Sequence, residues 1–203
     1  MAPALRLSRE ERREQLMGVG KEVFAERGYA ATTVEEIAER ADVSKPIVYE
    51  HFGGKEGLYE IVVDGEIDRL LGMLVGSLEE NVHPREAVER AADAFLRYIE
   101  SEPDGFRILV RDAPFGISRG SLPSVLGRIS GRAEEILARE LADRGYRVDT
   151  APLFARALVG MVALVGQWWL EVGKPEREVV VGHLVNLAWS GLRGLDLQPS
   201  GEA

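Results

Sequence analysis

Hydrophobic residues recur at intervals of three and four along most of this chain, which is the spacing of one face of an α-helix. No run of alternating β-branched residues predicts a strand. Pro84, Gly145 and Pro152 are among the residues that interrupt the helical pattern, because proline and glycine end helices. The pattern therefore predicts an all-α protein built from several separate helices.

The first of these predicted helices lie close together in the sequence and carry clear start signals. Ser8 begins the first helix with the spacing of a capping box, and Thr33 begins the second in the same way. Residues 41–43 form a turn, after which Ser44 caps a third helix with Pro46 in its first turn. A short helix held across another by a three-residue turn is a helix-turn-helix, which places its second helix in the major groove of DNA.

The charge of the chain limits the kind of DNA binding that is expected. Its 203 residues carry 25 basic and 34 acidic side chains, a net charge of −9. Residues 1–56 hold 9 basic and 11 acidic residues, a net of −2, and residues 57–203 hold 16 and 23, a net of −7. Since the N-terminal part is not basic, affinity for DNA depends on where individual cations lie, and non-specific binding should be weak and salt-dependent.

Composition also excludes several kinds of chemistry. The chain has no cysteine, which excludes a disulfide scaffold and a cysteine nucleophile and is typical of a reducing cytoplasm. His51, His83 and His183 lack metal-ligand spacing, and no phosphate-binding loop or nucleophile motif is present, so we expect neither an enzyme nor a cofactor. The most apolar segment, residues 157–170, is shorter than the ~20 residues that cross a bilayer, so we expect no membrane segment.

The motifs around the predicted helix ends follow one another in a specific order. They are, from Gly28 onward, GY, TTVEEIA, VSKPIVYEHF and KEGLY. This series resembles the DNA-binding domain of the TetR family of bacterial transcriptional regulators, almost continuously over residues 10–60. One position departs from the family, which usually has glycine in the turn where this chain has Asp42. Aspartate is among the residues that tolerate a left-handed backbone, so the turn is expected to survive.

The resemblance implies an architecture and a function. A three-helix helix-turn-helix domain in residues 1–54 is expected to bind double-stranded DNA, and a larger helical domain in residues 55–203 to bind an effector and to form a homodimer. A repressor that leaves a palindromic operator when a small, largely apolar ligand binds is the implied function. Two alternatives stay open: an activator, or a helical interaction protein of the same fold with DNA binding weakened or lost, which the acidic charge allows.

The family also implies which residues contact DNA. Thr33 and Tyr49 would grip phosphates, and Lys45 and Pro46 would touch base edges. Lys55 begins the fourth helix, where its ammonium and the free backbone amides would approach a phosphate together. Two further candidates have simpler explanations: Ser44 is mainly a helix cap, and His51 is a surface histidine. The full set is Thr33, Ser44, Lys45, Pro46, Tyr49, His51 and Lys55.

Two broad apolar stripes near the C-terminus predict helices that are buried, either in the core of one chain or in a four-helix interface between two copies. The dimer is favoured because a helix-turn-helix gains specificity by binding two half-sites. The first stripe contains Leu153, Ala157, Met161, Leu164, Val165 and Trp168, and the second contains Leu184, Leu187, Ala188, Gly191, Leu192 and Leu195.

An apolar cavity among the middle helices is the expected effector site. A ligand there shifts DNA binding only by its difference in affinity for the DNA-competent and incompetent states. The candidate lining residues are aromatic or aliphatic, and each is also explained as ordinary core. They are Phe95, Tyr98, Ile99, Phe106, Leu109 and Trp168.

Overall fold

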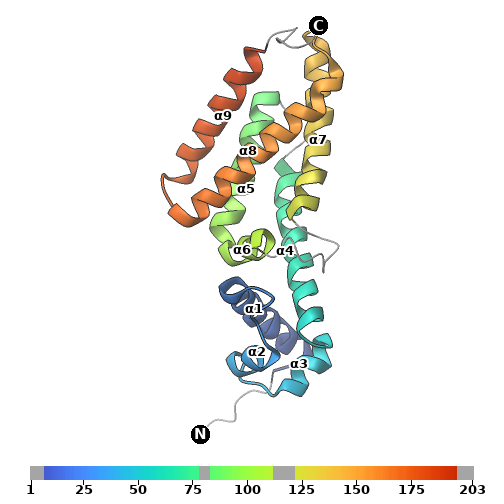
Figure 1. Ribbon diagram of the computed structural model, residues 1–203, viewed down its shortest axis with the longest axis vertical. Helices are drawn as coiled ribbons and strands as arrows, with labels where there is room; N and C mark the ends of the chain where they lie inside the picture. Colours follow the sequence, from blue (N-terminus) through green and yellow to red (C-terminus); the bar gives the residue numbers. More distant parts are fainter. Residues whose placement is uncertain (1–6, 78–82, 112–121, 196–203) are drawn as a thin grey trace. The chain divides into compact units, whose positions relative to one another are not determined.

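The computed structural model describes residues 7–77, 83–111 and 122–195, and within these ranges every regular element is a helix (Figure 1). The prediction of an all-α protein is therefore confirmed. The helices are α1 (Arg9–Arg27), α2 (Val34–Arg40), α3 (Lys45–Phe52), α4 (Lys55–Ser77), α5 (Pro84–Ser101), α6 (Pro103–Arg111), α7 (Leu122–Asp143), α8 (Ala151–Val172) and α9 (Arg177–Arg193), with a short 3-10 helix, Val148–Thr150, before α8.

The contacts between residues divide the chain into two compact units. The first unit contains residues 1–68 and 104–121, so it combines α1, α2, α3 and the start of α4 with nearly all of α6. The second unit contains residues 69–103 and 122–203, which include the end of α4 and helices α5, α7, α8 and α9.

The caps of α1 and α2 follow the sequence signals, with one difference. Ser8 Oγ accepts a hydrogen bond from Glu11 N at 3.2 Å, and Ser8 N donates to Glu11 Oε2 at 2.7 Å, which completes a capping box. Thr33 Oγ1 accepts from Glu36 N at 3.2 Å. The Glu36 carboxylate, however, pairs with Arg27 Nε at 2.7 Å. The expected second half of that box is thus replaced by an ion pair that ties α2 to the end of α1.

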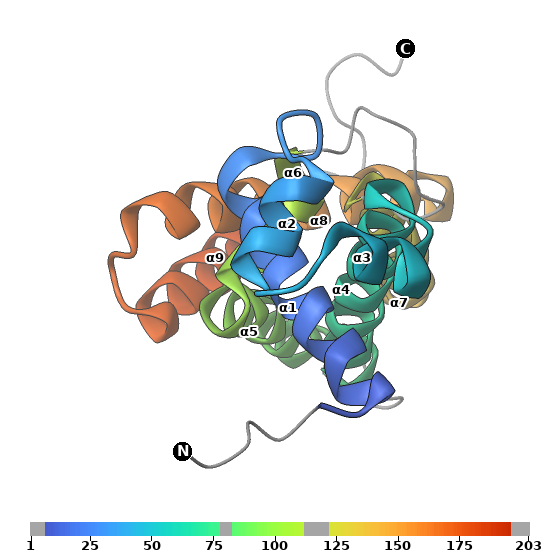
Figure 2. The same cartoon turned by 90° about the horizontal axis from the view of Figure 1, so that it is seen from below.

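The turn between α2 and α3 uses the residue that departs from the family pattern. Asp42 has φ of 52°, in the left-handed region, and the turn is closed by Val43 N, which donates to the carbonyl oxygen of Ala38 at 2.9 Å. Helix α3 then packs against the rest of the unit through the buried residues Val48 and Phe52. Figure 2 shows α2 and α3 joined by this turn. The prediction that aspartate preserves the turn is confirmed.

A glycine near the start of α4 allows this helix to begin directly after α3. A Cβ atom on Gly57 would lie 2.1 Å from the carbonyl oxygen of Phe52, far inside van der Waals contact. Gly53 and Gly54 have φ of 73° and 135° and turn the chain between the two helices. The direction in which α4 leaves the helix-turn-helix therefore depends on the absence of a side chain at residue 57.

Two charged side chains connect α1 to α4 and to α6 within the first unit. Lys21 Nζ lies 3.3 Å from Glu66 Oε1, and the Glu66 side chain is only 6% exposed. Arg111 Nη1, at the end of α6, donates to the carbonyl oxygens of Ala25 at 3.5 Å and Glu26 at 3.2 Å. These carbonyl groups belong to the last turn of α1, which has no intrahelical donors for them. Helix α6 thus caps the C-terminal end of α1.

In the second unit, α7 packs against α8, and α5 packs against both α8 and α9 (Figure 1). Gly166 permits the close approach of α8 and α5, because a Cβ atom there would lie 2.6 Å from Phe95 Cε1. Tyr146 Oη donates to the carbonyl oxygen of Leu195 at 2.7 Å, which ties the segment after α7 to the residues after α9. The unit is a layered bundle in which α5 and α8 are central.

Candidate DNA-binding surface and effector cavity

Helix α3 has one buried side and one exposed side, as a helix that reads DNA must have. Val48 is fully buried and Phe52 is 8% exposed, so these residues attach the helix to the rest of the first unit. Lys45, Pro46 and Tyr49 are exposed, and Tyr49 is 54% exposed despite its large ring. The three residues expected to read bases or grip a phosphate from α3 are therefore accessible together.

The remaining candidates on α2 and α3 lie at helix ends. Thr33 is exposed while its hydroxyl caps α2. Ser44 is the N-cap residue of α3, as expected, with an extended backbone, but its side chain makes no cap hydrogen bond. The reason is local, since Pro46 already removes one of the amides that a cap would satisfy. His51 is partly exposed in the last turn of α3.

The Lys55 ammonium is engaged within the fold. Its Nζ donates to the carbonyl oxygens of Tyr29 and Thr32, both at 2.9 Å, and lies 4.3 Å from the centroid of the Tyr29 ring. These contacts join the start of α4 to the segment between α1 and α2. Lys55 therefore has a structural role that the sequence did not reveal, and its phosphate contact stays a prediction.

Two polar residues of α1 position the helix-turn-helix through contacts that the sequence pattern did not predict. Arg13 Nη1 donates to the carbonyl oxygen of His51 at 2.9 Å, and its Cζ lies 4.6 Å from the centroid of the Phe52 ring. Gln15 Nε2 donates to the carbonyl oxygen of Ala41 at 3.2 Å. The partners are 38 and 26 residues apart in the chain, so no local pattern signals these bonds.

Lys45 and Glu35 form an ion pair across the helix-turn-helix. Lys45 Nζ lies 2.5 Å from Glu35 Oε1, and the two side chains are 52% and 59% exposed. The hydrogen bond from Lys45 lowers the pKa of the Glu35 carboxyl below its usual value. In the free protein, the cation expected to read base edges is therefore held by a carboxylate of α2.

The second unit contains a cavity whose described lining is wholly apolar. It encloses about 780 Å³ of space outside the protein atoms, part of which is open to solvent. Burial of an unpaired polar group costs several kcal/mol, so such walls favour alkyl or ring groups and disfavour charged ones. Helices α4, α5, α7, α8 and α9 contribute to the lining, through residues such as Leu74, Phe95, Ile136, Leu158, Val162 and Leu192.

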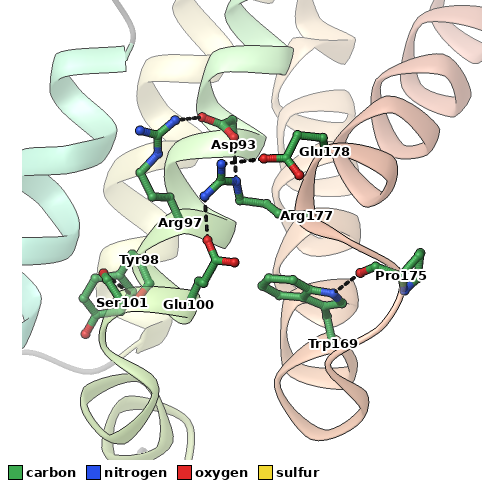
Figure 3. Close-up of polar contacts among 9 residues, drawn as sticks. All are labelled: Asp93, Arg97, Tyr98, Glu100, Ser101, Trp169, Pro175, Arg177 and Glu178. Atoms are coloured by element: carbon green, nitrogen blue, oxygen red, sulfur yellow. Dashed lines mark hydrogen bonds and ion pairs between the residues drawn. The ribbon is translucent and has the colours of Figure 1, made fainter.

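The structure brings one of the six predicted ligand residues to this cavity, namely Phe95. Trp168 is 49% exposed and is not among the lining residues of this cavity, so its place in an effector site stays a prediction. Its neighbour Trp169 is the buried one, and Trp169 Nε1 donates to the carbonyl oxygen of Pro175 at 2.7 Å (Figure 3). The other predicted residues are buried and are not among the lining residues of this cavity, in agreement with the alternative that they are ordinary core: Tyr98, Ile99, Phe106 and Leu109.

Helices α8 and α9 carry large apolar side chains that the single chain leaves exposed. Leu153 and Leu164 are each 66% exposed, and Leu187 is 63% exposed. Leu184 and Ala188 of the second stripe are buried within the chain, so the core interpretation applies to them, while the dimer interface stays a prediction. Contiguous exposed apolar residues mark interaction sites. We call this set the α8–α9 face: Leu153, Leu164, Trp168, Val172, Val179 and Leu187.

The same apolar character makes one segment comparable to a membrane span. Val148–Val172 is long and apolar enough to cross a bilayer by length and composition, with a mean hydropathy of 1.6. The expectation that this region is too short was based on residues 157–170 alone, and it is corrected by the full length of the helix. Only 17% of its most apolar window is buried in the single chain, and Leu153, Leu164 and Trp168 of this segment are exposed.

Arg177, at the start of α9, binds carboxylates on two helices (Figure 3). Its Nε lies 3.0 Å from Asp93 Oδ1 and its Nη1 lies 2.6 Å from Glu100 Oε2, both on α5. Its Nη2 lies 2.7 Å from Glu178 Oε1 on α9 itself. The Arg177 side chain is 17% exposed. This cluster attaches the start of α9 to α5, whose other side lines the cavity.

Helices α1, α2 and α3 form a DNA-binding head in which α3 is the exposed recognition helix, or reading helix. A second helical unit contains an apolar cavity. Together they define the chain as a helix-turn-helix transcriptional regulator. Two family models cover most of it. Residues 16–62 match the bacterial regulatory proteins of the tetR family, and residues 73–202 match the tetracyclin repressor-like C-terminal domain. The chain belongs to the TetR family of regulators, as the sequence motifs predicted.

Relatives and solved structures agree with this assignment. The HTH-type transcriptional activator FasR of Mycolicibacterium smegmatis is 32% identical over 96% of this chain and 89% of its own length. The HTH-type transcriptional repressor Rv3405c of Mycobacterium tuberculosis is 31% identical over 72% of this chain and 70% of its own length. A crystal structure of a TetR-like regulator from Rhodococcus sp. RHA1 is 28% identical, with a TM-score of 0.74 over 94% of this chain and all of that one.

Proposed function

We propose that this regulator is a cytoplasmic homodimer that binds a palindromic operator through residues 1–54 of each copy. Residues 55–203 form the dimer and take up a small apolar effector that changes the affinity for the operator. The single observation that carries the DNA-binding part is the exposed side of α3, where Lys45, Pro46 and Tyr49 are accessible next to a buried anchor.

Each DNA contact has a proposed role. Lys45 and Pro46 touch base edges in the major groove, and Tyr49 and Thr33 donate hydroxyl hydrogen bonds to phosphates. The start of α4 directs backbone amides toward a further phosphate, and Lys55 keeps that helix end in place through its bonds to the preceding loop. Because the head is not basic, these few contacts have to supply most of the affinity.

A binding selection tests this proposal directly. The full-length protein is incubated with a pool of randomised duplexes, and the recovered sequences are measured by fluorescence anisotropy at two salt concentrations. We expect a palindromic consensus, whose affinity falls with salt. Tyr49→Phe and Lys45→Ala should weaken binding, whereas Lys174→Ala, an exposed lysine in the loop between α8 and α9, should not. A failure to enrich any sequence would count against the regulator.

The effector part rests on the apolar cavity. We propose that it takes an uncharged or largely hydrocarbon molecule, because its described lining offers no polar side chain to bind a charged one. Nile red serves as an apolar fluorescent probe of the cavity in the full-length dimer. Val162→Trp fills part of the space and should lower nile red binding while operator binding persists. Unchanged dye binding by that variant would place the dye elsewhere.

Activation is a second candidate for the sign of regulation. Repression needs only that the bound dimer occlude a promoter, but FasR, which aligns with 96% of this chain, is an activator. In vitro transcription from a promoter that carries the selected operator separates the two. Added protein lowers transcript yield if the chain is a repressor and raises it if the chain is an activator.

A further inference from the structure

Glu35 faces the DNA-binding surface although it bears the same charge as DNA. We propose that Glu35 is a specificity-determining residue: it holds Lys45 in the free protein and in non-specific complexes, and releases it only to a base edge of the operator. The inference rests on the proposed function, in which Lys45 contacts DNA.

The positions of the two residues explain why they pair. Lys45 is the first residue of α3, where the positive end of the helix dipole disfavours a cation, and the first turn of α3 has no acidic residue. Glu35 lies in the first turn of α2, where the dipole favours an anion. The pair across the turn therefore gives α3 the negative charge that its own first turn lacks.

Lys45 is also the only lysine or arginine in α3, so its partner decides the charge that the reading helix presents. Other cations of the head are engaged in the fold. Arg13 donates to a backbone carbonyl oxygen, Lys55 donates to two, and Arg40 pairs with Glu26. The Lys45–Glu35 pair differs from these because both side chains are more than half exposed, so DNA competes directly for the lysine.

The competition has different outcomes for different DNA. An exposed ion pair contributes little free energy, and a single phosphate contact is of the same kind. If Lys45 leaves Glu35 for a phosphate, the binding free energy therefore gains little, and the Glu35 carboxylate is left beside a phosphate. A bidentate contact with guanine O6 and N7 is stronger and specific. Glu35 therefore penalises random DNA more than the operator.

The test compares Glu35→Gln with Glu39→Gln in the full-length protein. Glu39 is exposed on the same helix one turn further on, so both variants lose the same charge. On a random-sequence 30-base-pair duplex, Glu35→Gln should bind about two- to fivefold more tightly than wild type, with a salt slope steeper by about 0.9, as one added phosphate contact requires. Binding of the selected operator should tighten less, so the ratio of the two affinities falls.

A double-mutant cycle shows whether Glu35 acts through Lys45. Lys45→Ala should weaken operator binding, and Glu35→Gln should not tighten random-duplex binding in the Lys45→Ala background. Equal tightening by Glu35→Gln and Glu39→Gln, or tightening by Glu35→Gln without Lys45, overturns the inference. Failure of the proposed function is distinct, because the wild type would then enrich no sequence from the randomised pool. Circular dichroism confirms that each exposed variant is folded.

Discussion

Arg13 Nη1 donates to the carbonyl oxygen of His51 at 2.9 Å, so α1 holds the last turn of the reading helix by its backbone. The same guanidinium lies 4.6 Å from the centroid of the Phe52 ring. Because the bond goes to the backbone, the His51 side chain stays partly exposed while the position of α3 is fixed. The geometry of the DNA-binding surface thus depends on a residue that has no need to touch DNA.

Replacement of Arg13 by alanine should destabilise the head. The variant loses a hydrogen bond from a charged donor and a cation–π contact, so we expect the free energy of unfolding to fall by about 1–3 kcal/mol. Urea unfolding followed by circular dichroism measures the change. Arg9→Ala, an exposed change in the same helix, should stay within about 0.5 kcal/mol of wild type. Equal losses in the two variants would contradict the role given to Arg13.

Gly57→Ala should be among the most damaging single-methyl changes in the chain. The added Cβ would lie 2.1 Å from the carbonyl oxygen of Phe52, and a backbone atom has no rotamer by which to move away. We expect a loss of about 2 kcal/mol or more in thermal or urea unfolding, together with weaker operator binding. Gly65→Ala is the matched control on the same helix, because a Cβ atom at residue 65 would meet no neighbouring atom within 4 Å. Alanine there should stabilise α4 by about 0.5–1 kcal/mol.

The first unit could be predicted from the sequence because its signals are local. Ser8 with Glu11, Thr33 with Glu36, and the left-handed Asp42 are each read from residues at most three positions apart. Cap and turn chemistry act over such distances, which is why the helix boundaries followed. The hydrogen bonds that hold those helices together, from Arg13 to His51 and from Gln15 to Ala41, join residues far apart in the sequence, so no local pattern predicts them.

The cavity was harder to predict for a different physical reason. Large aromatic residues were expected to line it, but Tyr98 and Phe106 are fully buried in packed core. The actual lining is mostly alanine, valine, leucine and isoleucine, since small side chains leave the space that large ones would fill. Periodicity identifies which face of a helix is apolar, but it does not show where the side chains of facing helices are too small to fill the space between them.

Ser8→Ala should raise the pKa of the Glu11 carboxyl toward its usual value. The backbone hydrogen bond from Ser8 and the bond to its hydroxyl lower the pKa of Glu11 in the folded protein. The stabilisation is therefore fully present above the usual pKa of 4.5 and is lost as pH falls through the lowered value. The variant removes only the second bond, so the return should be partial. An NMR titration of the side-chain carboxyl groups measures it. Glu26, whose pKa is lowered by Arg40, should be unaffected.

Arg177→Met should loosen α9 from α5. It removes the cation that Asp93 and Glu100 share and keeps most of the aliphatic stem, so the loss is electrostatic rather than steric. We expect the free energy of unfolding to fall by about 1–3 kcal/mol, since Arg177 is largely buried while Glu100 is about half exposed. Arg193→Met, exposed at the other end of α9, is the control for loss of a cation from this helix. Hydrogen exchange should show faster exchange in the first turns of α9 in the Arg177 variant only.

A glutamate in the α8–α9 face should separate the dimer without unfolding the chain. Leu187 is 63% exposed in the single chain, so Leu187→Glu costs the monomer little but buries a charge in the proposed interface. Sedimentation velocity should show a dimer for wild type and a monomer for the variant, and operator affinity should fall because only one half-site is bound at a time. Val75→Glu, at a position 68% exposed on α4, controls for the added charge and should stay dimeric. A monomeric wild type, or a dimeric Leu187→Glu that binds the operator normally, would place the interface elsewhere.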